Sequence, residues 1–302
     1  MLRDALPKVS IVIPNYNRAD CLERCLDSLV AQTFNDFEVI ICDDGSTDNS
    51  EEVVNRYVDR LNLKFATAIN FGGPARPRNL GIVSSRAPYI AFLDSDDWWT
   101  PNKLFNSIPL LEAGADLVYH DLYIVSSKLQ TKYKHKIRST HPKIPMFHSL
   151  LCTGFSIPNS SVIIRKKILE RIGGITEDKD LISVEDYDTW IRVSKITEKF
   201  VRLDTCDGYY WVGGGNISAA SQMQQSKIKK LYSQYIEALP INKRDVAEKF
   251  LTYRVARIAQ NHNDFATAIN SYLKVIGSSL EFRYQLKALI LLTQTLWNQK
   301  IN

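Results

Sequence analysis

The sequence lacks any long run of apolar residues. A helix that spans a bilayer needs about 20 predominantly apolar residues, and no stretch of the 302 residues approaches that length. The first residues, Met1–Lys8, also lack the apolar segment of a secretory signal. We therefore expect a cytoplasmic protein without a membrane-spanning helix.

Cysteine is scarce, and its spacing carries no motif. The chain has five cysteines, and no two of them form the C-x-x-C pattern of redox or zinc sites. An odd number of cysteines without a secretory signal predicts reduced thiols in the cytosol. No nucleic-acid-binding motif is present either, so we expect no nucleic acid partner.

What the sequence does contain is typical of a globular protein. Hydrophobic residues make up 45% and charged residues 24% of the chain, which is enough for a sizeable core. The net charge of +5 is unevenly distributed, because residues 226–302 contain 12 Lys and Arg against 5 Asp and Glu, a net charge of +7. Such a basic segment favours contact with an anionic membrane surface over nucleic acid when no nucleic acid motif is present.

Strand-like and helix-like segments alternate over the first part of the chain, which predicts an α/β fold with a parallel sheet and crossover helices. The expected strands are Val9–Ile13, Phe37–Cys42, a segment around Phe65, Tyr89–Leu93, Asp116–Val125 and Val162–Ile164. The expected helices are Leu22–Val30, Val53–Leu61, Arg78–Ser84, one with Pro101 in its first turn, Lys166–Ile172 and Glu185–Ile196.

The character of the sequence changes after about Ser218. Helix-favouring segments follow at Ser226–Leu239, Asp245–Gln260, Phe265–Ile276 and Leu280–Asn298. We therefore divide the chain into an α/β domain, residues 1–218, and a helical C-terminal extension, residues 219–302, that faces a membrane, a partner or an acceptor. The last helix is rich in apolar residues, which fits either a helix docked in the core or one at a membrane interface.

The regular pattern is interrupted between Lys128 and Lys143. Basic residues punctuate a polar stretch there, at Lys128, Lys132, Lys134, Lys136, Arg138 and Lys143. Both a solvated loop or hairpin and a mobile flap over an anionic substrate fit this composition.

Three carboxylates follow the strand that ends at Leu93. Asp94, Asp96 and Asp97 lie within four positions, and burying such charges without a counter-charge is costly. A divalent cation is the natural counter-charge, since Mg²⁺ often binds one or two carboxylates together with substrate phosphates. The alternative for an isolated Asp-x-Asp is a solvated acidic turn.

Other motifs accompany this acidic turn in a fixed order. A strand precedes Pro14-Asn15-Tyr16-Asn17-Arg18, and another precedes Asp43-Asp44-Gly45-Ser46. Gly72-Gly73-Pro74-Ala75-Arg76-Pro77-Arg78-Asn79 comes before the acidic turn, and Gly173-Gly174 and Glu185-Asp186-Tyr187-Asp188-Thr189-Trp190 lie downstream. Over roughly residues 8–218 the chain resembles the family 2 glycosyltransferases with the GT-A fold, a Rossmann-like nucleotide-diphospho-sugar transferase fold.

The resemblance implies a site for a nucleotide base beyond the first two strands. Tyr16 would stack on or flank the base, and main-chain groups near Pro14 and Asn15 would contact it. Asp44 would accept a hydrogen bond from the base, and a carboxylate acceptor suits the N3–H donor of uracil. The alternative for residues 43–48 is a helix cap, which is compatible with base binding by Asp44.

The resemblance also implies the groups that bind the rest of the donor. Arg78 would contact the diphosphate, and an Arg on a phosphate makes charge-assisted hydrogen bonds. A surface salt bridge is the alternative role for Arg78. Asp96 would bind Mn²⁺ or Mg²⁺, and Asp94 would bind the ribose, the metal or both.

Asp186 is the candidate catalytic base. Glu185-Asp186 matches the Glu-Asp motif of the family. The resemblance implies that Asp186 removes a proton from the acceptor hydroxyl as that hydroxyl attacks the anomeric carbon. Glu185 and Asp188 are alternatives, and an acidic helix start without a catalytic role is another. A single inverting displacement needs no protein nucleophile.

One segment departs from the pattern of many relatives, which reads roughly Tyr-Arg-x-His-Gly-x-Asn-x-Ser. Here it is Tyr210-Trp211-Val212-Gly213-Gly214-Gly215-Asn216-Ile217-Ser218, so Trp211 replaces the arginine and Gly213 the histidine that helps hold the metal in some relatives. The protein must then bind the ion without that histidine. Trp211 would stack on a sugar face or be buried, and the glycines suggest a lid.

These features predict an inverting, metal-dependent glycosyltransferase that moves a sugar from a nucleotide sugar, a UDP-sugar, to a hydroxyl of a glycan or lipid-linked oligosaccharide in surface polysaccharide or glycan biosynthesis. Peripheral association with the cytoplasmic face of the inner membrane fits the basic extension. The alternatives are a nucleotidyltransferase, disfavoured because no Gly-rich basic loop follows the first strand, and an inactive scaffold with a helical interaction tail.

Overall fold

The computed structural model describes residues 6–141, 143–154, 156–214 and 221–301. The chain forms two compact units. Residues 1–142, 156–177 and 185–214 make up the first unit, and residues 143–155, 178–184 and 215–302 make up the second. The second unit therefore takes two short segments from within the span that the sequence assigned to one domain, and the predicted boundary at 218/219 lies outside the described residues.

A seven-stranded sheet forms the centre of the first unit. Its strands are β1 Val9–Asn15, β2 Phe37–Asp43, β3 Leu63–Thr67, β4 Tyr89–Phe92, β6 Leu117–Tyr119, β9 Ile163–Arg165 and β10 Phe200–Arg202. They lie in the order β10-β6-β9-β4-β1-β2-β3. Neighbouring strands run parallel except β9, which is antiparallel to both β4 and β6.

The central strands are apolar because both faces of the sheet are covered. Every residue of β1, β2 and β4 is buried, as expected for a parallel sheet flanked by helices. Glu38 in β2 is charged although it is buried. Its carboxylate accepts hydrogen bonds from the Ser10 hydroxyl and from the Arg86 main chain and side chain. The predicted α/β fold is confirmed, but the sheet is mixed and not purely parallel, because β9 is antiparallel to both of its neighbours.

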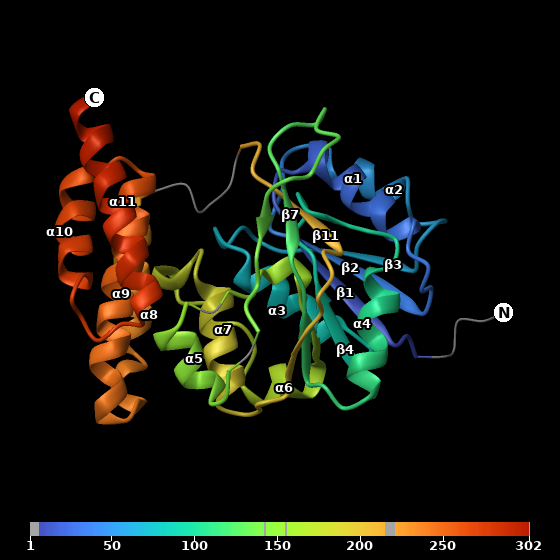
Figure 1. Ribbon diagram of the computed structural model, residues 1–302. Coiled ribbons are helices and arrows are strands. Elements are labelled where there is room, and N and C mark those ends of the chain that lie inside the picture. Colours follow the sequence, from blue (N-terminus) through green and yellow to red (C-terminus); the bar gives the residue numbers. More distant parts are fainter. Residues whose placement is uncertain (1–5, 142, 155, 215–220, 302) are drawn as a thin grey trace. The chain divides into compact units, whose positions relative to one another are not determined.

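Helices connect these strands (Figure 1). They are α1 Ala19–Val30, α2 Ser50–Asn55, α3 Ala75–Ser84, α4 Lys103–Glu112, α6 Lys166–Arg171 and α7 Glu185–Ser194. Pro101 lies in the turn before α4 rather than in its first turn, which corrects the sequence expectation. Gly173 follows α6 with a φ of 75°, a left-handed conformation that suits glycine at a helix end.

Helix α3 packs closely on β1 and β2, and Gly81 makes this approach possible. A Cβ atom on Gly81 would lie 2.4 Å from Cγ1 of Val12 and 3.2 Å from Sγ of Cys42. Both neighbours are fully buried, so neither has space into which it can move. The absence of a side chain at Gly81 thus sets the distance between the sheet and the helix that carries Arg78.

We expect Gly81→Ala to destabilise the protein by about 1–3 kcal/mol because the added methyl group overpacks the α3–β1 contact. This loss should outweigh the gain of about 1 kcal/mol in helix propensity that alanine brings. Urea denaturation followed by circular dichroism measures the change. Val83→Ala on the same helix, where the side chain is 79% exposed, is the control. An equal stability of Gly81→Ala and wild type would contradict the packing argument.

A smaller, four-stranded sheet also belongs to the first unit. Its strands are β5 Trp98–Trp99, β7 Leu122–Val125, β8 Lys136–Ile137 and β11 Gly208–Trp211, in the order β5-β11-β7-β8. Strands β7 and β8 pair antiparallel, so the basic stretch between them is a hairpin, one of the forms that the sequence predicted.

The single strand predicted for Asp116–Val125 is wrong. The chain forms two strands there, β6 in the large sheet and β7 in the small one. His120 and Asp121 lie between them, and both are buried. The imidazole Nδ1 of His120 lies 2.8 Å from the carbonyl oxygen of Asp121. This side chain–backbone contact takes the place of a hydrogen bond between strands.

The second unit is helical. Its helices are α5 Met146–Cys152, the short 3-10 helices η2 Lys179–Leu181 and η4 Ile236–Ala238, α8 Ser221–Ser233, α9 Ile241–Asn261, α10 Phe265–Val275 and α11 Phe282–Ile301. The predicted C-terminal helices are thus present, and α10 packs against both α9 and α11. Within the described residues, we find no helix with both the length and the apolar character needed to cross a membrane.

Candidate functional site

The sheet order of the first unit defines where a ligand site belongs. The chain runs from β1 outward to β2 and β3 and then returns to place β4 on the other side of β1. Ligands of open α/β sheets bind beyond the carboxyl ends of the strands at such a switch point. Asn15 ends β1, and Leu93-Asp94-Ser95-Asp96 follows β4. The structure therefore brings these two predicted segments to one edge of the sheet.

Arg78 links two of the predicted acidic motifs. Its Nη2 donates to Oδ1 of Asp94 at 2.7 Å, and its Nη1 donates to Oε1 of Glu185 at 2.7 Å. The arginine is 4% exposed, and its Nε lies buried without a hydrogen-bond partner. Burial alone would lower the pKa of Arg78, but the charges of Asp94 and Glu185 raise it above its ordinary value. The guanidinium is thus permanently charged and holds α3, the acidic turn and α7 together.

This arrangement changes the picture of Arg78 drawn from the sequence. A solvent-exposed salt bridge, the alternative, is wrong, because the Arg78 side chain is buried. Contact between Arg78 and a diphosphate stays a prediction, and both terminal nitrogens already donate to carboxylates.

The three carboxylates of the acidic turn have different surroundings. Asp97 is 1% exposed and accepts hydrogen bonds from the Ser160 hydroxyl at 2.6 Å and the Trp211 amide at 2.9 Å. Burial, with the charges of Asp96 and Asp94, raises the pKa of Asp97 well above its ordinary value. Asp97 therefore supports the turn from within.

Asp96 is less buried than Asp97, since 19% of its side chain is exposed. Nε of Arg18 lies 3.7 Å from its Oδ2, and Arg24 donates to its main-chain carbonyl at 3.1 Å. Burial and the charge of Asp94 raise the pKa of Asp96 to about 6. A cation bound beside Asp96 would stabilise the ionised form of this carboxylate.

The donor set at Asp94 and Asp96 fits a hard divalent cation. Both groups are carboxylates at the carboxyl end of β4, and Mg²⁺ or Mn²⁺ prefers oxygen ligands. Among the residues that the structure describes, no cluster of three or more His, Cys, Asp or Glu side chains is arranged to hold a metal. The site thus fits an ion held by two carboxylates together with substrate phosphates, rather than one enclosed by protein ligands.

Helix α7 begins with the predicted Glu-Asp motif. Its first turn contains Glu185, Asp186 and Asp188, and the amide of Tyr187 donates to Oδ1 of Asp186 at 2.7 Å. Glu185 is engaged by Arg78, and Asp188 accepts from Nε of Arg192 at 2.7 Å.

The electrostatics of this turn separate Asp186 from the two alternative bases. Burial, followed by the charge of Glu185, raises the pKa of Asp186 to about 7. A carboxylate with a pKa near the operating pH is suited to proton abstraction. Glu185 and Asp188 differ in their contacts, because each carboxylate already accepts a hydrogen bond at 2.7 Å from an arginine, Arg78 and Arg192 respectively.

The residues predicted to bind the base lie together at the ends of β1 and β2. Tyr16 is 48% exposed, and its ring is available for stacking. Asn15 is buried, donates to Asp43 at 2.8 Å, and leaves its Oδ1 buried without a hydrogen-bond partner. Asp44 accepts hydrogen bonds from the amides of Phe71 and Gly72 at 3.0–3.1 Å, so it also fixes the loop before α3. Pro14 is buried within β1.

Trp211 and Gly213 form a matched pair. A Cβ atom on Gly213 would lie 1.9 Å from Cζ2 of Trp211, so the tryptophan ring occupies the space that a side chain at position 213 would need. The Trp211 side chain is 7% exposed and packs with Cys21 and Val125. The buried alternative thus describes Trp211, and its stacking on a sugar stays a prediction. The predicted lid includes residues 215–218, which lie outside the described residues.

Sequence reasoning missed several residues at this site. Asn159 donates to Asp94 at 3.3 Å, and Ser160 accepts from the Asp94 amide at 3.1 Å while donating to Asp97. Burial raises the pKa of Tyr210 above its ordinary value, and the charges of Asp97 and its neighbours add to this shift. The 3-10 helix at Asn159–Ser161 has no motif in the sequence that would have identified it.

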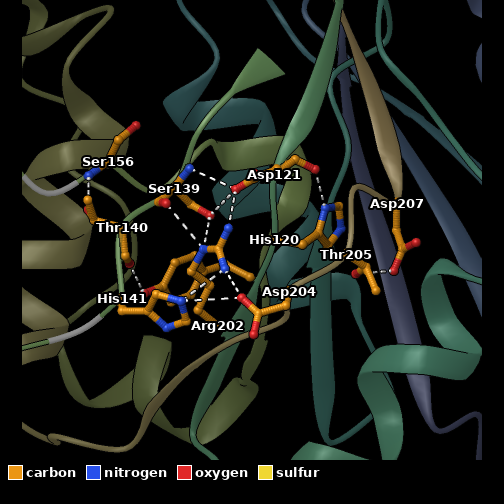
Figure 2. A network of polar contacts seen from close by, with 11 residues as sticks. His120, Asp121, Ser139, Thr140, His141, Ser156, Arg202, Asp204, Thr205 and Asp207 are labelled. Atoms are coloured by element: carbon orange, nitrogen blue, oxygen red, sulfur yellow. Dashed lines mark hydrogen bonds and ion pairs between the residues drawn. The ribbon is translucent and has the colours of Figure 1, made fainter. Parts of the chain in front are cut away.

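A second polar network lies away from this site, at the base of the β7–β8 hairpin (Figure 2). Arg202 donates to Oδ1 of Asp121 at 2.8 Å and to Oγ of Ser139 at 3.0 Å, and it also pairs with Asp204. Asp121 accepts two further hydrogen bonds from the amide and hydroxyl of Ser139. The network fixes both ends of the hairpin to β10, so the network is a structural element.

Aromatic rings on the small sheet form a ladder that reaches the acidic turn. The rings of Trp98 and Tyr209 stack at 4.9 Å, and those of Tyr209 and Tyr123 at 5.6 Å. Arg24 lies 3.6 Å above the Trp98 ring at one end, and Lys136 lies 4.8 Å from the Tyr123 ring at the other. The cation–π contact with Trp98 holds the guanidinium of Arg24, which donates to the main-chain carbonyl of Asp96.

A mostly parallel sheet with an acidic turn at its switch point is the arrangement that the resemblance to the GT-A glycosyltransferases predicts. The sequence model described as glycosyl transferase family 2 matches residues 10–173, more than half of the chain, and the chain belongs to that family. It is therefore a glycosyltransferase that uses a nucleotide sugar, as the sequence predicted. This membership favours the transferase over the nucleotidyltransferase and scaffold alternatives.

Curated relatives agree with this assignment. The chain is 30% identical over 228 residues to the UDP-Glc:alpha-D-GlcNAc-diphosphoundecaprenol beta-1,3-glucosyltransferase WfaP of Escherichia coli, covering 75% of this chain and 83% of the relative. It is 45% identical over 95 residues to a poly(ribitol-phosphate) beta-glucosyltransferase of Bacillus spizizenii, covering 30% of this chain and 15% of the relative.

Solved structures share the fold. A fragment of S. aureus TarS in complex with UDP-GlcNAc superposes with a TM-score of 0.67 at 21% identity, covering 89% of this chain and 80% of that one. The mannosyltransferase PcManGT from Pyrobaculum calidifontis, in complex with GDP-Man and Mn²⁺, has a TM-score of 0.63 at 16% identity, covering 97% of this chain and 81% of that one.

Proposed function

We propose that this protein is an inverting, metal-dependent glycosyltransferase that moves a sugar from a UDP-sugar to a hydroxyl of a glycan or lipid-linked oligosaccharide. The observation that carries the proposal is that Arg78 bridges the acidic turn after β4, at Asp94, to the first turn of α7, at Glu185. This bridge brings the turn of Asp94 and Asp96 to the helix start that contains Asp186. The similarity to a relative named for a diphosphoundecaprenol-linked acceptor supports the acceptor class. Surface polysaccharide or glycan biosynthesis is the corresponding role.

Asp186 acts as the base in this proposal. Its carboxylate accepts the proton of the acceptor hydroxyl as the hydroxyl oxygen attacks the anomeric carbon and the nucleoside diphosphate leaves. Burial and then the charge of Glu185 raise the pKa of Asp186, whereas the charge of Arg78 lowers it. Arg78 also holds Glu185, so it acts on the base both directly and through Glu185, besides any contact that it makes with the donor.

The uridine end of the donor belongs at the carboxyl ends of β1 and β2. Tyr16 offers an exposed aromatic face, and the buried Oδ1 of Asn15 and the carboxylate of Asp44 are acceptors suited to the N3–H of uracil. Asp94 and Asp96 would hold Mn²⁺ or Mg²⁺, which when bound neutralises negative charge on the departing diphosphate.

Calorimetry with UDP, GDP and TDP, with and without Mn²⁺, tests the donor assignment. UDP should bind most tightly, and chelation of Mn²⁺ should weaken its binding. Asp44→Asn should reduce the preference for UDP by roughly tenfold or more, since a hydrogen bond to a charged group is lost. Asp48→Asn, a carboxylate that accepts from the Ser50 hydroxyl, is the matched control. Equal affinities for the three nucleotides, unchanged by chelator, would contradict both assignments.

A lipid-linked acceptor would place the enzyme at a membrane surface. We infer peripheral association with the cytoplasmic face of the inner membrane, supported by the net charge of +7 over residues 226–302. Each Lys or Arg near an anionic surface contributes about 1 kcal/mol to such association.

A further inference from the structure

Helix α11 has two distinct apolar faces. Tyr284, Ala288, Leu292 and Thr295 are buried, and they line the face packed within the helical unit. Other large apolar side chains of the helix are exposed. These are Phe282 (76%), Leu286 (46%), Leu289 (48%), Ile290 (49%), Leu296 (41%) and Trp297 (68%), which together we name the α11 stripe.

The side chains of the α11 stripe face one side of the helix. At about 100° per residue the six fall within an arc of about 120°, on the side away from the buried residues. Phe282 and Trp297 mark its ends, about 22 Å apart at 1.5 Å per residue. Between these two residues, Thr293 is the one polar side chain within the arc. Scattered exposed apolar residues are ordinary, but six large ones on one side of a helix mark an interaction surface.

The charged residues within helix α11 have one sign. From Phe282 to Asn302 the chain has three basic residues, Arg283, Lys287 and Lys300, and no acidic residue. Arg283 and Lys287 lie at one border of the arc by helical spacing. Glu281 precedes the helix, and its carboxylate pairs with Arg283 at 2.7 Å. Basic residues bordering an apolar face with aromatic residues are typical of a helix that lies in a membrane interface.

We propose that the α11 stripe docks on an anionic bilayer, with the apolar side chains in the acyl boundary and Arg283 and Lys287 at the lipid phosphates. This inference deepens the proposed use of a lipid-linked acceptor and rests on that proposal for its purpose. Charge argues against a second copy as the occupant, because two α11 stripes face to face would bring the basic residues of both copies together, and the one acidic neighbour in sequence, Glu281, already pairs with Arg283.

Flotation of the full chain with vesicles tests the proposal. Vesicles of phosphatidylglycerol and phosphatidylcholine should bind the protein, and vesicles of phosphatidylcholine alone should bind it much less. Leu289→Ser with Trp297→Ser should lower the partition coefficient by about tenfold or more. Lys287→Gln should lower it by about fivefold, and high salt should do the same.

Matched controls come from the first unit. Phe105→Ser removes a side chain on α4 that is 60% exposed, and Lys167→Gln removes one exposed basic charge on α6. Both should bind vesicles like wild type. Circular dichroism verifies that each variant is folded, which the exposure of the substituted side chains favours.

Three results would overturn the proposal. The first is that the Leu289→Ser, Trp297→Ser variant partitions like wild type, and the second is that the wild type does not bind phosphatidylglycerol vesicles at low salt. The third is a concentration-dependent dimer in sedimentation velocity that the same variant abolishes, without vesicle binding. UDP binding by calorimetry is measured in parallel, so a failure here is distinguishable from a failure of the proposed function.

Discussion

Asp186→Asn should lower the rate of sugar transfer by roughly 10²–10⁴-fold, the range over which general bases contribute. The asparagine side chain keeps the size of the aspartate but cannot accept the proton of the acceptor hydroxyl. UDP binding should be nearly unchanged, because the base acts on the acceptor and not on the nucleotide. Steady-state transfer assays and calorimetry with UDP measure the two effects separately.

The pH dependence of the wild type provides a second measurement of the same group. Because burial and Glu185 raise the pKa of Asp186 to about 7, the carboxyl is protonated and inactive below that pH. The transfer rate should therefore fall as pH falls through about 7. Glu185→Gln removes a neighbouring charge, so it should move this transition to lower pH.

The same raised pKa affects stability. A carboxyl with a folded pKa above its unfolded value stabilises the protein at low pH, and this contribution is lost as pH rises towards about 7. Asp186→Asn removes the buried charge, so the variant should be at least as stable as wild type at pH 8. Loss of activity cannot then be attributed to unfolding. Normal transfer by Asp186→Asn, with loss in Glu185→Gln or Asp188→Asn, would assign the base to one of those residues instead.

The central strands were predictable because burial on both faces leaves a direct mark in the sequence. Strands β1 and β2 are runs of buried residues, half of them β-branched, and polar turn residues follow each strand. Short strands leave no such mark. Strand β10 has three residues. The split of Asp116–Val125 into β6 and β7 falls at the buried His120 and Asp121, and the Asp121 carboxylate pairs with Arg202, 81 positions away.

The candidate site was predictable in its positions and less so in its contacts. Carboxylates that follow buried parallel strands must meet at one edge of the sheet, so Asp44 and Asp94 could be placed from the pattern alone. The contact between Arg78 and Glu185 joins residues 107 positions apart, and no local periodicity encodes it. The fit of the Trp211 ring over Gly213 is likewise a packing relation that appears only in the folded chain.

Arg78→Met should destabilise the protein by about 3–5 kcal/mol, the cost of leaving buried carboxylates without their counter-charge. Glu185 is 4% exposed and would lose its arginine partner, and Asp94 would lose one of its hydrogen-bond donors. Adding Glu185→Gln to Arg78→Met should recover part of this loss, since it removes the unpaired charge. Urea denaturation of the single and double variants measures both effects.

Arg76→Met on the same helix is the matched control. Arg76 pairs with Glu177 at 3.0 Å, but both side chains are well exposed, so its loss should change stability by about 0–1 kcal/mol. Transfer by Arg78→Met should also fall, because α7 and the acidic turn lose the group that holds them together. Equal stabilities of Arg78→Met and Arg76→Met would show that solvent already screens the Asp94–Arg78–Glu185 bridge. In that case a direct contact with the diphosphate would be the better account of why an arginine stands at this position.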